Sequence, residues 1–254
     1  MPLINRLNHL SYSSISLFRN APSVWCIKYL YGIRDEMAPA ALRGRAIEAG
    51  LDLALMKSAP FEDCLDVALQ NFTVNLEGVV TPGSETETLL IAPMLRNAIE
   101  VMQEHGPPSA RQVLIEGWIE GVPIPIVGYA DYLWPEAVVD LKTTKRMPSE
   151  PTPDHAMQVG GFYAHELKRK PFLLYTTPGK AKLIEIHDRE GARQDFETTA
   201  RALAHALQSF EDPAQMTKAY APDFTSFYWS EPTKAKAKEI YQWTPQSSGN
   251  GSRP

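Results

Sequence analysis

The alternation of apolar and polar positions divides the chain into a helical first part and a second part that begins with strands. Apolar residues recur at helical spacing in segments that predict helices at about 13–32, with an interruption at Ala21-Pro22, and at 40–57, 61–75 and 89–105. From residue 112 the period changes to two, which predicts strands at 112–119, 122–134, 138–143, 172–176 and 182–186. Further helices are expected at 154–169 and 198–210. The first third is therefore expected to be a helical lobe and the strands to form the sheet of the core.

The most informative pair of strands lies on either side of Pro135-Glu136, which is typical of a hairpin turn. If the turn is symmetric about these two residues, Asp131 faces Asp140. Opposed side chains in an antiparallel pair lie about 4.5–5.5 Å apart, and like charges at that distance destabilise a sheet. A divalent cation such as Mg²⁺ or Mn²⁺ would offset the repulsion. Strand alternation places Lys142 on the same face as Asp140, which gives equipment suited to attack on a phosphodiester.

A plain surface hairpin with solvated aspartates is the alternative reading of this segment. The residues around the two aspartates argue against it, because they are apolar on both faces, as in a strand buried on both sides: Val127, Tyr129, Leu133, Val138, Val139 and Leu141. Buried carboxylates need a partner.

Composition limits the function classes without choosing one. The 254 residues are 44% hydrophobic and 22% charged, which is ordinary for a soluble globular protein. No apolar run is long enough to span a bilayer, and a cytoplasmic location without a membrane partner is expected. The net charge of −5 argues against nonspecific coating of nucleic acid but is compatible with a local basic groove. Cys26 and Cys64 lack metal-ligand spacing and are expected to be free core thiols.

Four motifs follow one another along the chain: Gly44-Arg45-Ala46-Ile47-Glu48, Gly128-Tyr129-Ala130-Asp131, Asp140-Leu141-Lys142 and, on a following helix, Gln158. In this order they resemble the PD-(D/E)XK nuclease superfamily, in particular its RecB-type and phage lambda-type exonucleases. Each motif alone is weak, and the specificity lies in the ordered set. The resemblance implies an α/β (α+β) fold with a central mixed β-sheet flanked by helices, a restriction-endonuclease-like core. A single nuclease domain is expected over 1–243, with a helical lobe at about 10–108, a catalytic core at about 110–212 and a disordered tail at 244–254.

The resemblance also implies roles for these residues. One or two Mg²⁺ (or Mn²⁺) ions would be held by the side chains of Glu48, Asp131 and Asp140 and by the carbonyl of Leu141, and Lys142 and Gln158 would act in catalysis beside the two aspartates. The family's aromatic residue lies four positions after the glutamine, whereas Tyr163 lies five after Gln158, a displacement of about 100° around an α-helix. Ala130 stands where the family name has proline. No iron–sulfur cluster is expected, because Ala21 precedes Pro22 where the cluster variants have cysteine.

The expected activity is metal-dependent DNA exonuclease action in recombination or repair, as in end resection of the phage or prophage type. The expected DNA contacts are Arg43, Arg45, Lys145 and Tyr163. By analogy with the family, a single-strand annealing protein is a candidate partner and a ring-shaped homo-oligomer a candidate assembly. Three alternatives stay open: an endonuclease of the same fold, a non-catalytic DNA-binding subunit of this fold, and an unrelated protein with a coincidental hairpin.

Overall fold

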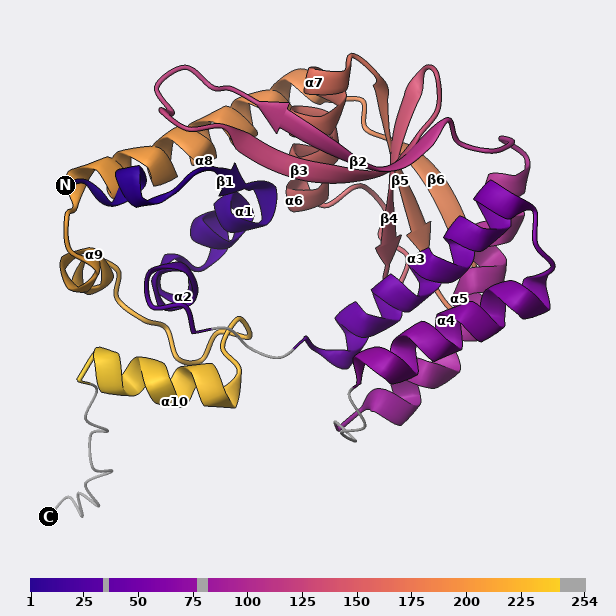
Figure 1. Cartoon of the computed structure of the whole chain (residues 1–254), viewed down its shortest axis with the longest axis horizontal. Helices are drawn as coiled ribbons and strands as arrows, with labels where there is room; N and C mark the ends of the chain where they lie inside the picture. Colours follow the sequence, from indigo (N-terminus) through magenta and orange to yellow (C-terminus); the bar gives the residue numbers. More distant parts are fainter. Residues whose placement is uncertain (34–36, 77–81, 243–254) are drawn as a thin grey trace, which may run out of the picture.

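The computed structural model describes residues 1–33, 37–76 and 82–242. These residues contain a six-stranded mixed sheet. Its strands are β1 (Leu10–Ser11), β2 (Ala110–Gly117), β3 (Ile126–Leu133), β4 (Ala137–Thr143), β5 (Lys170–Thr176) and β6 (Ala181–Glu185). The α/β fold with a mixed sheet flanked by helices, expected from the sequence, is confirmed (Figure 1).

The third strand, β3, is the centre of the sheet. One edge of β3 pairs antiparallel with β2 from Ala110↔Leu133 to Gly117↔Ile126. Its other edge pairs in parallel with β1 at its start and antiparallel with β4 at its end. The β4 strand then pairs in parallel with β5, and β5 pairs antiparallel with β6. The strands that carry Asp131 and Asp140 are thus held between neighbours.

Helices cover the sheet from two separate groups. The first group contains α1 (Tyr12–Asn20), α2 (Pro22–Trp25), the π-helix η2 (Cys26–Leu30), α8 (Arg189–Ser209), α9 (Pro213–Ala219) and α10 (Glu231–Ile240), with the short 3₁₀ helix η1 (Leu3–Arg6). The second contains α3 (Pro39–Lys57), α4 (Phe61–Asn75) and α5 (Ser84–Gln103). Between β4 and β5 lie α6 (Pro153–Ala156), the π-helix η3 (Met157–Tyr163) and α7 (Ala164–Leu167).

The helices that were expected to form one lobe at about 10–108 lie in two places. The core residues of α1 and α2, including Ile15 and Trp25, pack in one hydrophobic cluster with Phe162 and Phe196. Those of α3 to α5 pack in another, with Tyr132, Val139 and Leu174 of the sheet. Figure 1 shows α1 and α2 beside α9 and α10, across the molecule from α3 to α5. The physical reason is a non-local pairing, because β1 joins β3 and carries α1 away from α3.

Several expected boundaries shift. The strand expected at 122–134 begins only at Ile126, because Pro123 and Pro125 cannot donate to a ladder. The helix expected at 198–210 begins at Arg189, where the Asp188 side chain accepts a hydrogen bond from the backbone nitrogen of Gly191 at 2.9 Å. The helices α9 and α10 had no predicted counterpart. The expected tail at 244–254 lies outside the described residues.

Both cysteines are buried free thiols, as predicted. In the described ranges, every helix is too short or too polar to cross a bilayer.

Candidate active site

The hairpin between β3 and β4 has the predicted register. Trp134 and Ala137 exchange backbone hydrogen bonds across Pro135-Glu136, and the ladder continues with Leu133↔Val138 and Tyr132↔Val139. The paired positions end there, and Asp131 and Asp140 are the next residues on the two strands. The Asp131 side chain reaches across the pair, and its Oδ2 accepts a hydrogen bond from the backbone nitrogen of Leu141 at 2.8 Å. The two strands therefore bring the predicted aspartates together.

A chain of polar contacts runs from Asp140 to the helix after β4. Lys142 Nζ lies 2.5 Å from Asp140 Oδ2 and donates to Gln158 Oε1 at 2.8 Å. The other end of the same amide, Gln158 Nε2, donates to the hydroxyl of Tyr163 at 2.8 Å. Asp140 is buried, at 2% exposure, so its charge has little solvent to stabilise it. The ammonium of Lys142 is the compensating charge, and Gln158 fixes its direction.

Tyr163 shares a face of its helix with Gln158 because the helix is not an α-helix there. Residues Met157–Tyr163 form a π-helix, whose hydrogen bonds join residue i to residue i+5. A residue five positions after Gln158 therefore returns to the glutamine's side, and the 100° displacement expected for an α-helix does not occur. Phe162 points instead into the core, where its ring stacks on Phe196 with centroids 4.9 Å apart. Tyr163 itself is buried, at 2% exposure.

Glu48 reaches the site from α3, which a buried ion pair joins to α5 and a hydrogen bond joins to the sheet. Arg43, one turn earlier on α3, pairs with Glu87 of α5 and donates from NH2 to the carbonyl of Thr143 at 3.2 Å. Arg43 is only 3% exposed and Glu87 6% exposed. This contact holds the middle of α3 against the end of β4. The side chain of Glu48 is thereby directed towards Asp131.

The basic residues expected to contact DNA differ in placement. Arg43 is buried in its ion pair with Glu87, so its side chain is not available to contact DNA. Arg45 is exposed. Lys145 is also exposed, although its Nζ lies 2.7 Å from Glu87 Oε1.

Gln112 belongs to the cluster and was not identified from the sequence. Its Nε2 donates to Glu48 Oε1 and, at 3.2 Å, to Asp131 Oδ1. Gln112 lies on β2, directly opposite Asp131 in the register of the β2–β3 pair. That register depends on the irregular connection between the two strands, so no local pattern in the sequence indicates it. The register of the β2–β3 pair, and with it the residue next to Asp131, follows only when the residue at which β3 begins is known.

Burial and mutual repulsion raise the pKa values of two carboxyl groups in the cluster. Burial raises the pKa of Asp131 well above its usual range, and the nearby charges of Asp140 and Glu48 raise it further. Burial and the charge of Asp52 raise the pKa of Glu48, which the hydrogen bond from Gln112 partly opposes. Burial alone would lower the pKa of Lys142, but the charges of Asp140 and Asp131 outweigh it, so its pKa is raised and the ammonium form is favoured. The cluster has an excess of negative charge that favours a cation.

The donor set of the cluster fits a divalent metal ion of the hard, oxygen-binding type. Asp140 Oδ2 is buried and receives no well-aligned hydrogen bond, despite its ion pair with Lys142. Carboxylate and carbonyl oxygens are the ligands that Mg²⁺ and Mn²⁺ prefer. In the described part of the chain, however, no three acidic, histidine or cysteine side chains converge as a ready-made ligand group. Gln112 and Lys142 contact carboxylate oxygens of the cluster.

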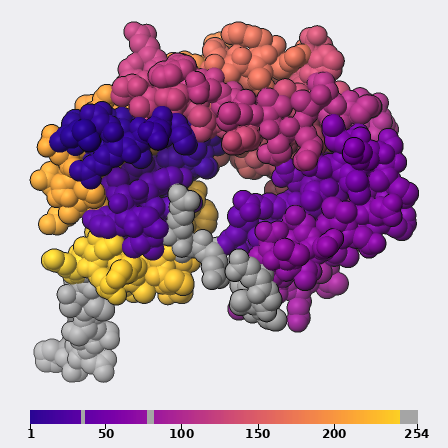
Figure 2. All heavy atoms as spheres, viewed as in Figure 1, coloured from indigo at the N-terminus to yellow at the C-terminus, as the bar shows by residue number. Residues whose placement is uncertain are grey.

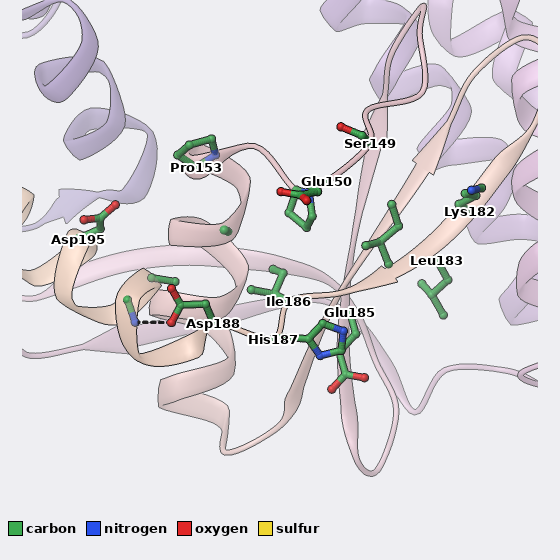
Figure 3. A pocket seen from close by; sticks show the side chains of 15 residues that line it. Ser149, Glu150, Pro153, Lys182, Leu183, Glu185, Ile186, His187, Asp188 and Asp195 are labelled. Carbon is green, nitrogen blue, oxygen red and sulfur yellow. Dashed lines mark hydrogen bonds between the residues drawn. The ribbon is translucent and has the colours of Figure 1, made fainter.

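A large cavity of about 840 Å³ lies elsewhere, between β6, α6 and the start of α8 (Figure 3). None of the predicted site residues lines it. Its charged lining is mainly acidic, with Glu150, Glu185, Asp188 and Asp195 against Lys182. An acidic lining repels phosphate, so this cavity is not where a nucleic acid backbone would bind.

Comparison with known proteins identifies the family of this chain. The family model of the PD-(D/E)XK nuclease superfamily matches residues 9–242. Among solved structures, the crystal structure of SSO0001 matches with a TM-score of 0.32 and 20% identity, covering 68% of this chain and 80% of the other. No match was found among curated proteins. Since the family model spans nearly all of the described residues, including both strands of the hairpin, the chain belongs to the PD-(D/E)XK nuclease superfamily.

Proposed function

We propose that this protein is a metal-dependent DNA exonuclease that acts in recombination or repair in the cytoplasm. The observation that carries the proposal is the convergence of Asp131, Asp140 and Lys142 at one hairpin, with Gln158 bonded to the lysine. Membership of the superfamily supports nuclease activity. The choice of exonuclease rests on the motif order, which resembles the RecB-type and lambda-type enzymes.

The proposed metal ligands are Glu48, Asp131, Asp140 and the carbonyl of Leu141, with Mg²⁺ or Mn²⁺ as the ion. Ions bound there would supply the Lewis acidity that phosphodiester hydrolysis needs and offset the charge of the carboxylates. The chain itself keeps these oxygens in place. The backbone of Leu141 holds Asp131 by a hydrogen bond of 2.8 Å, and the anchoring of α3 by Arg43 keeps Glu48 beside it.

Lys142 is the proposed electrostatic catalyst. Its ammonium is fixed between Asp140 and Gln158, so no reorganisation is needed when negative charge develops on the phosphoryl oxygens. Gln158 is proposed to orient the lysine, and Tyr163 to hold the amide of Gln158 through its hydroxyl. Removal of either support should let the ammonium rotate away from the reacting phosphate.

DNA is proposed to reach this cluster from the side of α3, the helix that carries Glu48. The space-filling view in Figure 2 shows an opening below the sheet, with α3 on one side and α1 and α2 on the other. The exposed side chains of Arg45 and Lys145 are the proposed phosphate contacts. An annealing protein as partner and a ring of several copies remain proposals by family analogy.

The test compares an end-labelled linear duplex with covalently closed circular DNA, each with Mg²⁺, Mn²⁺ or EDTA. The proposal predicts that the linear duplex is degraded with either metal, that EDTA prevents this, and that the circle persists. Degradation of the circle, which has no ends, would show that the protein is an endonuclease and not an exonuclease. Persistence of both substrates with each metal would contradict nuclease activity.

A further inference from the structure

Gln112 occupies an unusual backbone position in a regular part of the sheet. Its neighbours keep the ladder with β3, as Arg111↔Tyr132 and Val113↔Ala130, yet Gln112 has a φ of 47°. The left-handed region is unfavourable for residues other than glycine, and such outliers persist only where the surrounding structure holds them. The fold therefore maintains a costly conformation at the residue opposite Asp131.

This conformation directs the side chain of Gln112 to two carboxylates from different elements. Its Nε2 contacts Glu48 of α3 and Asp131 of β3 at the same time. A neutral amide that donates to both reduces the mutual repulsion of two charges that burial has already disfavoured. The same two oxygens belong to the proposed metal site.

We infer that the Gln112 amide takes the place between Glu48 and Asp131 that a shared cation needs, and that the cation must displace it. Gln112 is then a positioning residue that keeps the two carboxylates together before metal binds. Because it stabilises only the metal-free state, it weakens the apparent affinity for the cation. This inference rests on the proposed metal-dependent function.

Two other roles for Gln112 make different predictions. If the amide turned over and offered its Oε1 to the cation as a ligand, removal of the side chain would weaken metal binding. If Gln112 served only the geometry of the strand, metal affinity would not depend on its amide.

The test measures Mn²⁺ binding by the electron paramagnetic resonance of free Mn²⁺, with wild type, Gln112→Met and Gln112→Gly. Both variants remove the amide, but methionine keeps the strained backbone whereas glycine relieves it. Both variants should bind Mn²⁺ about tenfold more tightly than wild type. The reason is that the cation no longer has to break the hydrogen bonds from the exposed Gln112 amide to the two carboxylates. Glu116→Gln, an exposed substitution on the same strand, is the control and should leave the affinity unchanged.

Unchanged or weaker Mn²⁺ binding in both Gln112 variants would overturn the inference. If only the glycine variant bound more tightly, the effect would belong to backbone strain, and the inference would fail as well. Asp140→Asn distinguishes a failure of the metal site from a failure of the proposed role of Gln112. If it abolishes binding while the Gln112 variants behave as wild type, the metal site stands and the role of Gln112 is wrong. If wild type itself binds no Mn²⁺, the proposed function fails together with the inference.

Discussion

The carboxylates of the cluster are buried and close to one another, and both conditions disfavour their charged forms. Asp131 lies among the charges of Asp140 and Glu48, and its folded-state pKa is raised by burial and by those charges. A carboxyl group with a raised pKa stabilises the fold fully only below its unfolded value of about 3.9. As the pH rises through the raised pKa, that contribution is lost. At neutral pH without metal, Asp131 therefore reduces the stability of the protein.

Asp131→Asn should raise the melting temperature of the metal-free protein. The expected difference from wild type is small near pH 4 and grows as the pH rises towards 8, because only wild type must ionise a disfavoured carboxyl group. Thermal denaturation in EDTA across this pH range measures it. Mg²⁺ should then raise the melting temperature of wild type but not that of the variant. A difference that is independent of pH would show that Asp131 is not destabilised by its charge.

The hairpin and Gln112 illustrate what the sequence reveals at this scale. The register of Asp131 and Asp140 could be predicted because Pro135 and Glu136 leave little freedom to the turn. Gln112 could not, because its left-handed backbone is imposed by tertiary structure and has no signal in a strand-like sequence. The roles assigned to Glu48, Lys142 and Gln158 stay predictions from the family resemblance, supported by their contacts.

Among the elements, α3 is fixed to the sheet by charge as well as by apolar packing. The Arg43–Glu87 pair is buried between α3 and α5, and Arg43 also contacts Thr143 at the end of β4. Removal of Arg43 would leave the buried carboxylate of Glu87 with only the exposed Lys145, whose Nζ lies 2.7 Å away, as a partner. Arg43 was expected to contact DNA because it is basic and adjacent to the Glu48 motif. Only the packing of α5 against α3 reveals its buried partner.

Arg43→Met should lower the free energy of unfolding by about 3–5 kcal/mol, the usual cost of breaking a buried pair. Arg45→Met, two residues along the same helix but exposed, should change it by less than about 0.5 kcal/mol. Denaturant unfolding measures both, and DNA binding by the folded proteins provides the second comparison. The expected loss of DNA affinity belongs to the Arg45 variant. Equal stability of the two variants would contradict the structural role of Arg43.

The helix that carries Gln158 is positioned by close contact with α8. A Cβ atom on Gly161 would lie 2.3 Å from the backbone oxygen of Ala192, which is too close for any side chain. A Cβ on the neighbouring Gly160 would meet side-chain atoms alone, the Cγ2 methyl of Ile186 at 3.0 Å and the Cβ of Ala192 at 3.5 Å. The structure assigns the closest approach to Gly161 and α8.

Gly161→Ala should destabilise the protein by about 1–3 kcal/mol or more, because helix backbones must separate to admit the methyl group. Gly160→Ala should stay within about 1 kcal/mol of wild type, since the better helix propensity of alanine offsets a mild contact. Differential scanning calorimetry of the two variants checks this. If Gly160→Ala were the more damaging substitution, the packing of η3 on α8 would be wrong.

Element types were predictable where their periodicity was long, and relative placement was not. The segments of α3, α4 and β5 follow from their apolar spacing. The π-helix at Met157–Tyr163 does not, because α-helical spacing was expected there, and that spacing leaves open whether Tyr163 or Phe162 lies beside Gln158. A helix of mostly polar residues, such as α10, gives a weak signal and was not predicted.

At the scale of the whole molecule, the sheet joins two hydrophobic clusters and carries the site between them. One cluster surrounds α1, η3 and α8, and the other surrounds α3, α4 and α5. Glu48 lies on α3, a helix of the second cluster, and Gln158 lies on η3, a helix of the first. The complete site therefore needs both clusters to pack correctly on the sheet. The division of the helical lobe could not be predicted, since it depends on the parallel pairing of Leu10 with Ile126, far apart in the chain.

The most direct test of the central claim is the single-turnover cleavage rate of an end-labelled linear duplex with saturating Mg²⁺. Wild type is compared with Lys142→Met and with the control Lys182→Met, whose lysine is exposed on β6 in the acidic cavity. Lys142→Met should slow cleavage by roughly 10²–10³-fold while DNA affinity persists, because a fixed charge that stabilises the transition state is lost. The control should cleave like wild type. A Lys142→Met protein that is folded, binds DNA and cleaves at the wild-type rate would contradict the account.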